Sequence, residues 1–434
     1  MLPAARIAAA IEVLAEVDAR RRPVVDALKD WGLSHRFAGS KDRAAIANHV
    51  YDALRLRDSA RWIMGSDDAR ATVLGSLGRA RGLDLAAIDA LFSGQGHAPA
   101  ALTEVERARL ASPSLDGAPA HVAADIPEWM EPAFLAAFGD RAAHEGAALA
   151  GRAPVDLRVN LLKTTRDKAL AQLDHLGAQA TALSPVGLRI HLTADGRAPA
   201  LSAEPAYVKG AVEVQDEGSQ LAALLAAASP GDQVLDLCAG GGGKTLALAA
   251  LMDNRGQLYA ADSDGRRLMP IYDRLERAGV RNVQVRAPKG RDGLDAAIAD
   301  LKDRCDVVLV DAPCTGTGAW RRNPDAKWRV RPGALEQRIG DQDRVLAQAA
   351  RCVKPGGLAL YITCSVLIEE NEARVAAFLA AHPKFEAMTG EALAKRAGLP
   401  DLARFASPHG PGLRLSPATS GTDGFYVCGI ARRV

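Results

Sequence analysis

Two cysteines each follow an apolar segment that has the length of a buried parallel strand. Cys314 lies in VVLVDAPCTGTG and Cys364 lies in LALYITCSVLIEENE. In an open α/β sheet, ligands bind beyond the carboxyl ends of the strands, where we expect these two thiols to lie. A thiolate can attack a bound substrate, so the pair predicts covalent chemistry. The competing interpretation is that both are small buried residues, as free cysteines often are.

A glycine-rich turn precedes the cysteines. A predicted strand ends at Asp236, four glycines follow at Gly240–Gly243, and a predicted helix begins near Lys244. Glycines let the backbone approach a ligand closely, and the amides at a helix N-terminus suit an anion. The turn is neither the standard P-loop, whose first glycine would fall at Cys238, nor the complete dinucleotide-binding pattern.

An acidic residue, Asp262, ends the next predicted strand, about 20 residues beyond the glycine turn. An acid at this place commonly bonds the hydroxyls of a ribose, and the alternative is a helix N-cap. The turn and the acid together predict an adenosine-bearing cofactor with a carboxylate or phosphate end.

The segment WRRNPDAKWR (320–329) mixes cationic and aromatic side chains. Cations contact phosphates and aromatic rings stack on bases, so the segment indicates nucleic-acid binding. The alternative is a solvated loop with one buried tryptophan. The candidate contacts are Arg321, Arg322, Lys327 and Trp328. A second basic cluster, Arg55, Arg57 and Arg61, lies on a helix predicted to have Ser40 as its N-cap and to run to Trp62. For this cluster a solvated face is favoured over phosphate contact.

The elements that must position these residues change character along the chain. Residues 231–434 alternate predicted strands with helices, a pattern that indicates a doubly wound parallel sheet closed by an antiparallel final strand. Residues 151–210 read as a small α+β unit, and residues 1–110 read as all-helical. We therefore expect a helical domain over 1–125, linker helices with a small α+β subdomain over 126–210, and the main α/β domain over 211–434.

Composition sets few further limits. The 434 residues are 48% apolar and 24% charged, as in an ordinary soluble protein, and the net charge of +2 neither demands nor excludes a nucleic-acid partner. The six cysteines contain no Cys-x-x-Cys pair, and the nine histidines lack the spacing of metal ligands. We expect a cytoplasmic monomer that binds neither metal nor membrane.

Seven motifs of the chain occur together and in order in one known family. They are RVNLLK (158–163), VQDEGSQL (214–221), DLCAGGGGKT (236–245), DAPCTGTG (311–318), RRNPDAKW (321–328), YITCS (361–365) and DGFYV (423–427). From about Val155 to the C-terminus the chain thus resembles the RNA cytosine carbon-5 methyltransferases of the RsmB and nucleolar-protein type. The helical N-terminal region resembles the antiterminator-like RNA-binding domain of the bacterial members.

The resemblance implies a class I methyltransferase fold with S-adenosylmethionine as its cofactor, and RNA as the partner. Asp262 would hold the ribose of the cofactor, and Asp311 would lie beside both the cofactor and the target base. The methionine end would lie against Cys238, Ala239, Gly240, Gly241, Gly242, Gly243 and Lys244.

The resemblance also assigns catalytic roles. Cys364, as a thiolate, would attack carbon 6 of the cytosine, which makes carbon 5 able to accept the methyl group. Asp311 would bond ring nitrogen 3 and the exocyclic amine. Cys314 would remove the carbon-5 proton or assist its removal, and Lys163 would orient the base. Ribosomal RNA is the first expectation for the substrate and transfer RNA the second.

The chain departs from the family pattern in two places. Gly241 stands where the family turn usually has proline, and Ala287 stands where an aspartate usually contacts the cofactor, with Asp292 a few residues later. These departures keep one alternative open, a non-catalytic RNA-binding assembly factor with the same fold. A DNA cytosine methyltransferase would lack the second cysteine, Cys364, and a small-molecule enzyme would not need residues 320–329 or the N-terminal domains.

Overall fold

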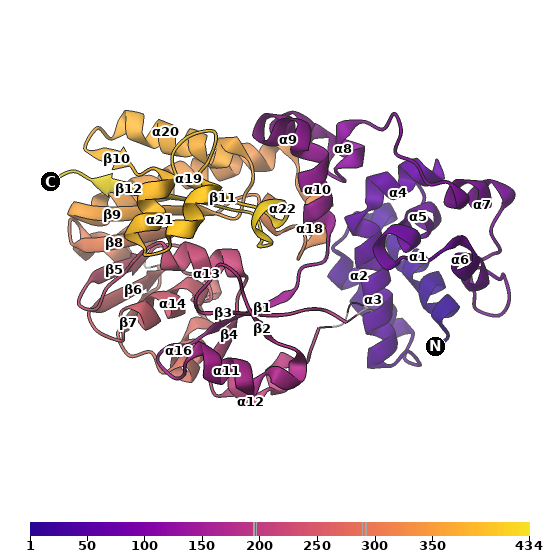
Figure 1. Ribbon diagram of the computed structural model, residues 1–434, viewed down its shortest axis with the longest axis horizontal. Helices are drawn as coiled ribbons and strands as arrows, with labels where there is room; N and C mark the ends of the chain where they lie inside the picture. Colours follow the sequence, from indigo (N-terminus) through magenta and orange to yellow (C-terminus); the bar gives the residue numbers. More distant parts are fainter. Residues whose placement is uncertain (194–195, 197, 289, 291–292) are drawn as a thin grey trace. The chain divides into compact units, whose positions relative to one another are not determined.

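The computed structural model describes residues 1–193, 196, 198–288, 290 and 293–434 (Figure 1). The chain forms two compact units. The N-terminal unit contains Met1–Arg152 together with Trp320–Val330, and the C-terminal unit contains Ala153–Ala319 and Arg331–Val434. The short segment 320–330 therefore packs with the first unit, although the residues before and after it in sequence belong to the second.

The N-terminal unit is helical, as predicted. Its helices are α1 (Pro3–Arg20), α2 (Val24–Ser34), α3 (Ser40–Arg55), α4 (Arg57–Met64), α5 (Ala69–Arg81), α6 (Leu85–Leu91), α7 (Glu104–Ala111), α8 (Ala120–Ala123), α9 (Glu131–Phe138) and α10 (Ala142–Ala150), with α18 (Pro324–Arg329) from the later segment. Helix α1 is amphipathic, and Ile7 and Leu14 on its apolar face are each 1% exposed in the core.

The helix predicted from Ser40 to Trp62 is wrong in two respects. The residue before the helix is Gly39, so Ser40 is the first helical residue and forms no side-chain cap bond. The helix also ends at Arg55, because Leu56 (φ −114°, ψ 29°) leaves the helical region before α4 begins. No glycine or proline marks this break, so the sequence carried no signal for it.

The C-terminal unit begins with a small antiparallel sheet in the order β2-β3-β1-β4. Its strands are β1 (Val155–Val159), β2 (Gln179–Ala180), β3 (Gly187–Ile190) and β4 (Val212–Val214), and its helices are α11 (Arg166–Gln172) and α12 (Pro205–Val208). Leu157 and Leu188, which are opposite each other on β1 and β3, are completely buried between sheet and helix. This is the small α+β unit that the sequence predicts.

The large sheet has the order β10-β12-β9-β8-β5-β6-β7, with β11 paired to β12. Strands β9, β8, β5, β6 and β7 are parallel, and β12 is antiparallel to β9, as expected of the final strand. The strands are β5 (Gln233–Asp236), β6 (Gln257–Ala261), β7 (Val283–Arg286), β8 (Cys305–Asp311), β9 (Val353–Thr363), β10 (Phe385–Ala387), β11 (Leu413–Leu415) and β12 (Phe425–Arg432).

Helices cover both faces of this sheet, as the predicted doubly wound fold requires. Along β8, Val308 and Val310 pack on one face, and Val307 and Leu309 pack on the other. This alternation is that of a strand buried on both sides. The first face is covered by α17 (Gly293–Ile298), α19 (Pro332–Cys352) and α20 (Glu372–Ala381), and the second by α13 (Glu217–Leu224), α14 (Gly243–Leu251) and α21 (Gly390–Arg396). The remaining short helices are α15 (Gly265–Leu268), α16 (Ile271–Ala278) and α22 (Pro417–Ser420).

Candidate functional site

The strand order reverses between β5 and β8, and the predicted site residues lie at the carboxyl ends around this reversal. Asp236 ends β5 and Asp311 ends β8. Asp262 directly follows β6, and Cys364 directly follows β9. Ligands of open α/β sheets bind at such a reversal, because the connecting loops separate there and leave a crevice.

The two cysteines that the sequence singles out lie in contact. Cys314 Sγ is 3.4 Å from Cys364 Sγ, and both residues are half-buried. The hydrogen bond to Cys364, together with burial, raises the pKa of Cys314 well above its usual value. Cys305 and Cys352, by contrast, are buried within the core on one face of the sheet.

The loop that carries Cys314 is fixed to neighbouring strands by its backbone. Ala312 N donates to Ile362 O at 2.8 Å, and Gly318 N donates to Cys364 O at 2.9 Å. Gly318 also faces Gly424, and a Cβ on Gly318 would collide with the Gly424 carbonyl. This close approach explains why the motifs DAPCTGTG and DGFYV both need glycine at the contact.

Asp311 is held by a buried cation. Lys244 Nζ lies 2.6 Å from Asp311 Oδ2, and the Lys244 side chain is 8% exposed. Burial works to lower the pKa of Lys244, but the charge and hydrogen bond of Asp311 outweigh it, and the net pKa is raised. Lys244 therefore remains charged, and Asp311, whose side chain is 35% exposed, keeps a carboxylate open to a ligand.

The glycine turn has the backbone geometry that a close-fitting ligand needs. Gly240 (φ +50°) and Gly242 (φ +82°) adopt left-handed conformations, and a Cβ on Gly242 would collide with Ile271. Gly240 N donates to Asp262 Oδ2 at 2.9 Å, which joins the turn to the predicted ribose-binding acid. Asp262 Oδ2 also pairs with Arg267 at 3.4 Å, whereas Oδ1, which accepts from Asp264 N at 2.9 Å, retains an acceptor position, so these residues fit the methionine and ribose parts of S-adenosylmethionine.

Gly241, which replaces the usual proline, is held by an arginine that the sequence analysis did not identify. Arg274 Nη1 donates to Gly241 O at 2.6 Å, and Arg274 also pairs with Glu213 at 3.5 Å. This contact restrains the turn where proline would have done so by its ring. Ala287 follows β7 directly, whereas Asp292 lies outside the described residues.

A second missed arginine joins the small sheet to the glycine turn. Arg158 Nη1 on β1 donates to Gln215 Oε1 at 2.5 Å and to Gly243 O at 2.6 Å. The motifs RVNLLK and VQDEGSQL therefore meet at the start of α14. Arg158 and Gly243 are 85 residues apart in sequence. No local sequence pattern could therefore have predicted this hydrogen bond.

Lys163, which the resemblance places at the target base, is engaged elsewhere. Its Nζ donates to Lys209 O at 2.8 Å and to Arg277 O at 2.5 Å. These bonds tie the loop after β1 to α12 and α16. The predicted role in orienting the base therefore requires Lys163 to leave two carbonyl partners.

The segment RRNPDAKW is largely buried in the N-terminal unit. Lys327 is 2% exposed and its Nζ donates to Arg55 O at 3.0 Å, while Trp328 Nε1 donates to Leu54 O at 2.6 Å. Arg321 is 5% exposed, and Arg322 is half-buried. Burial of Arg321 and Lys327 does not fit the predicted contact with RNA, since phosphate binding needs an exposed cation.

The arginines of α3 and α4 are also structural, which corrects the prediction of a solvated face. Arg55 Nη1 donates to the carbonyls of Gly151 and Arg321, at 2.9 and 2.5 Å, and burial lowers its pKa to about 10. Arg57 lies over the ring of Trp328, and Arg61 pairs with Asp18 at 2.7 Å. The break between α3 and α4 turns these side chains toward partners within the unit.

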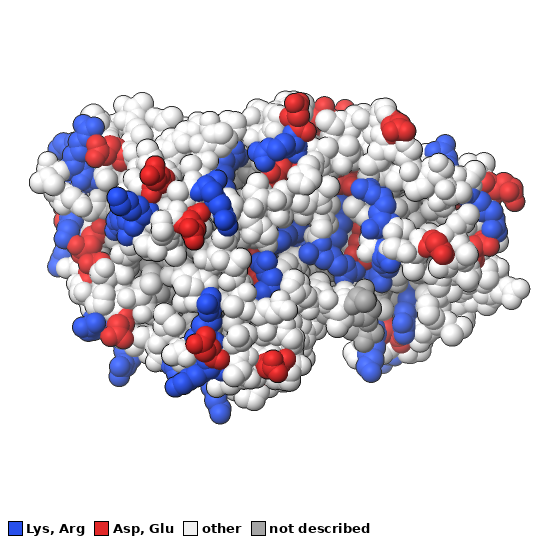
Figure 2. All heavy atoms as spheres, viewed as in Figure 1, with Lys and Arg blue, Asp and Glu red and all other residues white. Residues whose placement is uncertain are grey.

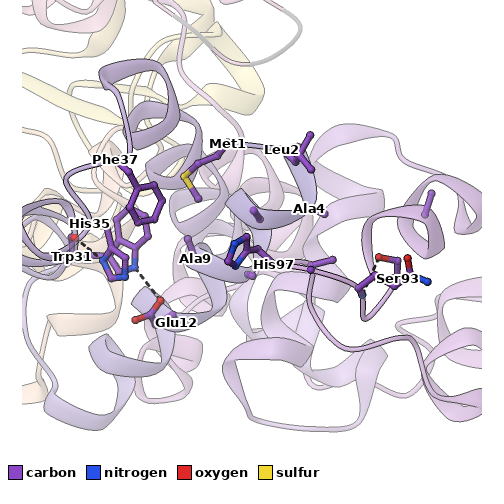
Figure 3. Close-up of a pocket in the computed structure, with 16 residues that line it drawn as sticks. Met1, Leu2, Ala4, Ala9, Glu12, Trp31, His35, Phe37, Ser93 and His97 are labelled. Carbon is purple, nitrogen blue, oxygen red and sulfur yellow. Dashed lines mark hydrogen bonds between the residues drawn. The ribbon is translucent and has the colours of Figure 1, made fainter.

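The N-terminal unit contains a pocket that the sequence analysis did not predict (Figure 3). Its volume is about 810 Å³, and its lining includes alanines of α1 and an aromatic group. Trp31 and His35 stack at 4.2 Å, and Trp31 Nε1 donates to Glu12 at 3.0 Å. Phe37, which is 73% exposed, meets His35 edge-on.

On the face drawn in Figure 2, Lys and Arg side chains are interspersed with Asp and Glu, with uncharged surface between them. Among the described residues, no cluster of three or more His, Cys, Asp or Glu could hold a metal ion. None of the helices described is both long and apolar enough to cross a membrane.

Comparison with family models identifies two matching regions. Residues 223–431 match the model described as 16S rRNA methyltransferase RsmB/F, and residues 126–195 match the ferredoxin-like domain of RsmF/B-like methyltransferases. The first region contains the glycine turn, both thiols and the two acidic residues of the site.

Comparison with individual proteins agrees. The chain is 37% identical over 300 residues to ribosomal RNA small subunit methyltransferase B of Sodalis glossinidius, a match that covers 69% of this chain and 64% of the relative. The match thus spans a little under two thirds of that relative's length. The crystal structure of PH0851 superposes with a TM-score of 0.70 and 25% identity over 99% of both chains. A methyltransferase homologue from Pyrococcus horikoshii superposes with a TM-score of 0.58 and 25% identity over 74% of this chain and 99% of its own.

Proposed function

The chain belongs to the RsmB/F family of S-adenosylmethionine-dependent methyltransferases, and on that premise we propose that it methylates carbon 5 of a cytosine in RNA. The observation that carries the proposal is the contact between Cys314 Sγ and Cys364 Sγ at 3.4 Å. Two half-buried thiols beside an accessible carboxylate supply a nucleophile, a proton-transfer group and a base-binding group in one crevice.

The nucleophile is Cys364. Carbon 5 of cytosine is a poor nucleophile, and bond formation between the Cys364 thiolate and carbon 6 makes carbon 5 electron-rich. S-adenosylmethionine, when bound, supplies the methyl group on a positively charged sulfur. The glycine turn and Asp262 would hold the methionine and ribose ends of the cofactor next to the crevice.

Asp311 binds the base during this step. Its carboxylate would bond ring nitrogen 3 and the exocyclic amine, and so offset the charge that develops on the ring. Lys244, whose Nζ donates to Asp311 Oδ2 at 2.6 Å, keeps the Asp311 carboxylate in place. The target cytosine must be unpaired or turned out of a helix to reach these groups.

Release of the product requires loss of the carbon-5 proton. Cys314 enters this step as a thiolate that has released its own proton to water, and it accepts the proton from carbon 5. The electrons of the carbon–hydrogen bond form the double bond between carbons 5 and 6, and the bond from carbon 6 to Cys364 breaks with its electron pair on sulfur. Once Cys364 is bonded to carbon 6 as a thioether, its sulfur no longer accepts the hydrogen bond of Cys314 as a thiolate does. The main cause of the raised pKa of Cys314 is then removed.

Ribosomal RNA of the small subunit is the substrate that we propose first. The support is the family description and the name of the Sodalis relative, both of which refer to small-subunit ribosomal RNA. Transfer RNA is the second candidate, because the crevice itself selects a cytosine and not a particular RNA.

The test is methyl transfer from labelled S-adenosylmethionine to bulk bacterial RNA, followed by nucleoside analysis. The wild-type protein is expected to produce 5-methylcytidine, and Cys364→Ala is expected to lose activity by a factor of about a thousand or more. Cys352→Ala, which removes a buried thiol at the opposite end of β9 from Cys364, is the matched control and should remain active. Full activity of Cys364→Ala, or methylation at another atom, would contradict the proposal.

A further inference from the structure

Glu370 is a buried carboxylate that the chemistry described above does not use. It lies in the turn between β9 and α20, six residues after Cys364, and is 0% exposed. Burial of a carboxylate is costly unless hydrogen bonds compensate it. The donors that compensate Glu370 identify what the residue does.

Those donors are Thr315, which directly follows Cys314, and Gln342, which also bonds the carbonyl of Pro313 directly before Cys314. Thr315 N donates to Glu370 Oε1 at 2.8 Å, and Thr315 Oγ1 donates to Oε2 at 2.5 Å. Gln342 Nε2 on α19 donates both to Glu370 Oε1 and to Pro313 O, each at 3.0 Å. Glu370 and Gln342, from two different elements, thus form hydrogen bonds to the backbone directly after and directly before Cys314.

The backbone of Glu370 is itself anchored. Tyr361 on β9, which is completely buried, donates from its hydroxyl to Glu370 O at 2.6 Å. The same strand carries Cys364 at its end. The network therefore connects the loop of one thiol to the strand of the other, and it sets the distance between the two sulfurs.

We propose that Glu370 is a positioning residue that holds Cys314 against Cys364 for loss of the carbon-5 proton and release of the RNA. The role of Glu370 in proton loss and RNA release rests on the proposed function. The claim that Glu370 positions the Cys314 thiol rests on geometry alone. The negative charge of Glu370 also contributes to the raised pKa of Cys314. In this account Glu370 touches neither the base nor the cofactor.

The first test needs no RNA. Diamide oxidises two adjacent thiols to a disulfide and is itself reduced to a hydrazine, so the rate of Cys314–Cys364 linkage reports how well the sulfurs are held together. Mass spectrometry of the linked peptides identifies the pair. Glu370→Ala, which removes the acceptor of three donors, is expected to slow this linkage about tenfold.

Three further variants make the first test specific. Glu370→Gln keeps the shape and an acceptor oxygen, so its linkage rate is expected to stay within about threefold of wild type. Thr315→Val, which removes one donor, should fall between the two. Glu369→Ala, the neighbouring residue, is the matched control and should behave as wild type. If Glu370→Ala does not fold, Thr315→Val takes its place as the test variant. A wild-type linkage rate in the folded test variant would overturn the proposal.

The second test uses RNA and reads the step directly. Glu370→Ala is expected to transfer one methyl group per enzyme at close to the wild-type rate and then to accumulate a denaturation-resistant RNA adduct, at least about tenfold above wild type. If Glu370→Ala loses the first methyl transfer and forms no adduct, while Cys314→Ala does accumulate adduct, then Glu370 does not act in the loss of the carbon-5 proton. If even Cys314→Ala forms no adduct, the proposed function fails, and the disulfide rate still decides whether Glu370 positions Cys314.

Discussion

Cys314 and Cys364 reach each other because of the register of two neighbouring strands. In the parallel pair of β8 and β9, Asp311 is opposite Ile362. The loops that follow these two strands therefore leave the sheet side by side. Cys314 then lies three residues beyond its strand's last residue and Cys364 one residue beyond. Chemistry at this site is therefore a property of residues at strand ends, and the buried cysteines within strands or helices have no comparable access.

Asp262 gives a test of the cofactor site at the residue scale. Asp262→Ala removes both the predicted ribose acceptor and the acceptor of Gly240 N, so S-adenosylmethionine should bind more weakly by about 1–3 kcal/mol. Isothermal titration calorimetry measures the dissociation constant. Asp264→Ala removes a carboxylate from the same loop, where it caps α15, and should change binding little. An unchanged dissociation constant in Asp262→Ala would refute the assignment.

Asp236 gives a prediction about pH. Burial raises the pKa of Asp236 from 3.8 to about 7, against the opposing hydrogen bond from Thr245. The folded protein then binds more protons than the unfolded chain between these values, so Asp236 lowers stability as the pH rises from about 4 to 7. Asp236→Asn should therefore be more stable than wild type at pH 8, by a few kcal/mol at most, and gain little at pH 4. Thermal melts across this range measure the difference, and an equal difference at all pH values would contradict the pKa.

At the scale of elements, periodicity predicted the strands but not the ends of the helices. Strands such as β8 are continuous apolar runs that end in polar turn residues. This pattern can be recognised in the sequence without any knowledge of tertiary contacts. The break at Leu56 carries no such signal. Of the site, the strand-end residues were predictable, whereas Glu370, Gln342 and Arg274 were not, because their partners are brought close only by the fold.

The segment at 320–330 shows how a motif can mislead. Its charges and tryptophans are typical of RNA contact, yet Trp320 stacks on Phe134 at 5.9 Å and Lys327 reaches the end of α3. Burial lowers the pKa of Lys327 to about 8, while Asp125 and Asp58 act to raise it. A buried cation among buried carboxylates indicates that the segment holds the N-terminal unit together.

Lys327→Met tests this interpretation. The change leaves Asp58 and Asp125 without their buried cation and Arg55 O without its donor, so we expect a loss of about 2–4 kcal/mol of stability. Chemical denaturation measures the loss. Arg329→Met removes an exposed charge from the same helix and should cost far less, on the order of 0.5 kcal/mol. Unchanged stability of Lys327→Met, with weaker and less salt-dependent RNA binding, would restore the RNA-contact interpretation.

At the scale of the whole molecule, topology accounts for the place of the site. The chain adds β6 and β7 on one side of β5 and then returns to add β8 and β9 on the other, which creates the reversal where the site residues gather. Alternating strands and helices predicted this fold class from the sequence. The division into two units was less predictable, because residues 320–330 belong to the N-terminal unit although they lie far from it in sequence.

The central claim is that Cys364 attacks RNA and that Cys314 allows its release. The most direct measurement is a denaturing gel of Cys314→Ala after incubation with total bacterial RNA and S-adenosylmethionine, with the variant lacking both thiols as its control. The account predicts a nuclease-sensitive shifted band that requires Cys364, and sequencing of the trapped RNA would identify the cytosine. Absence of the band from a protein that binds S-adenosylmethionine, or a band that persists without Cys364, would contradict it.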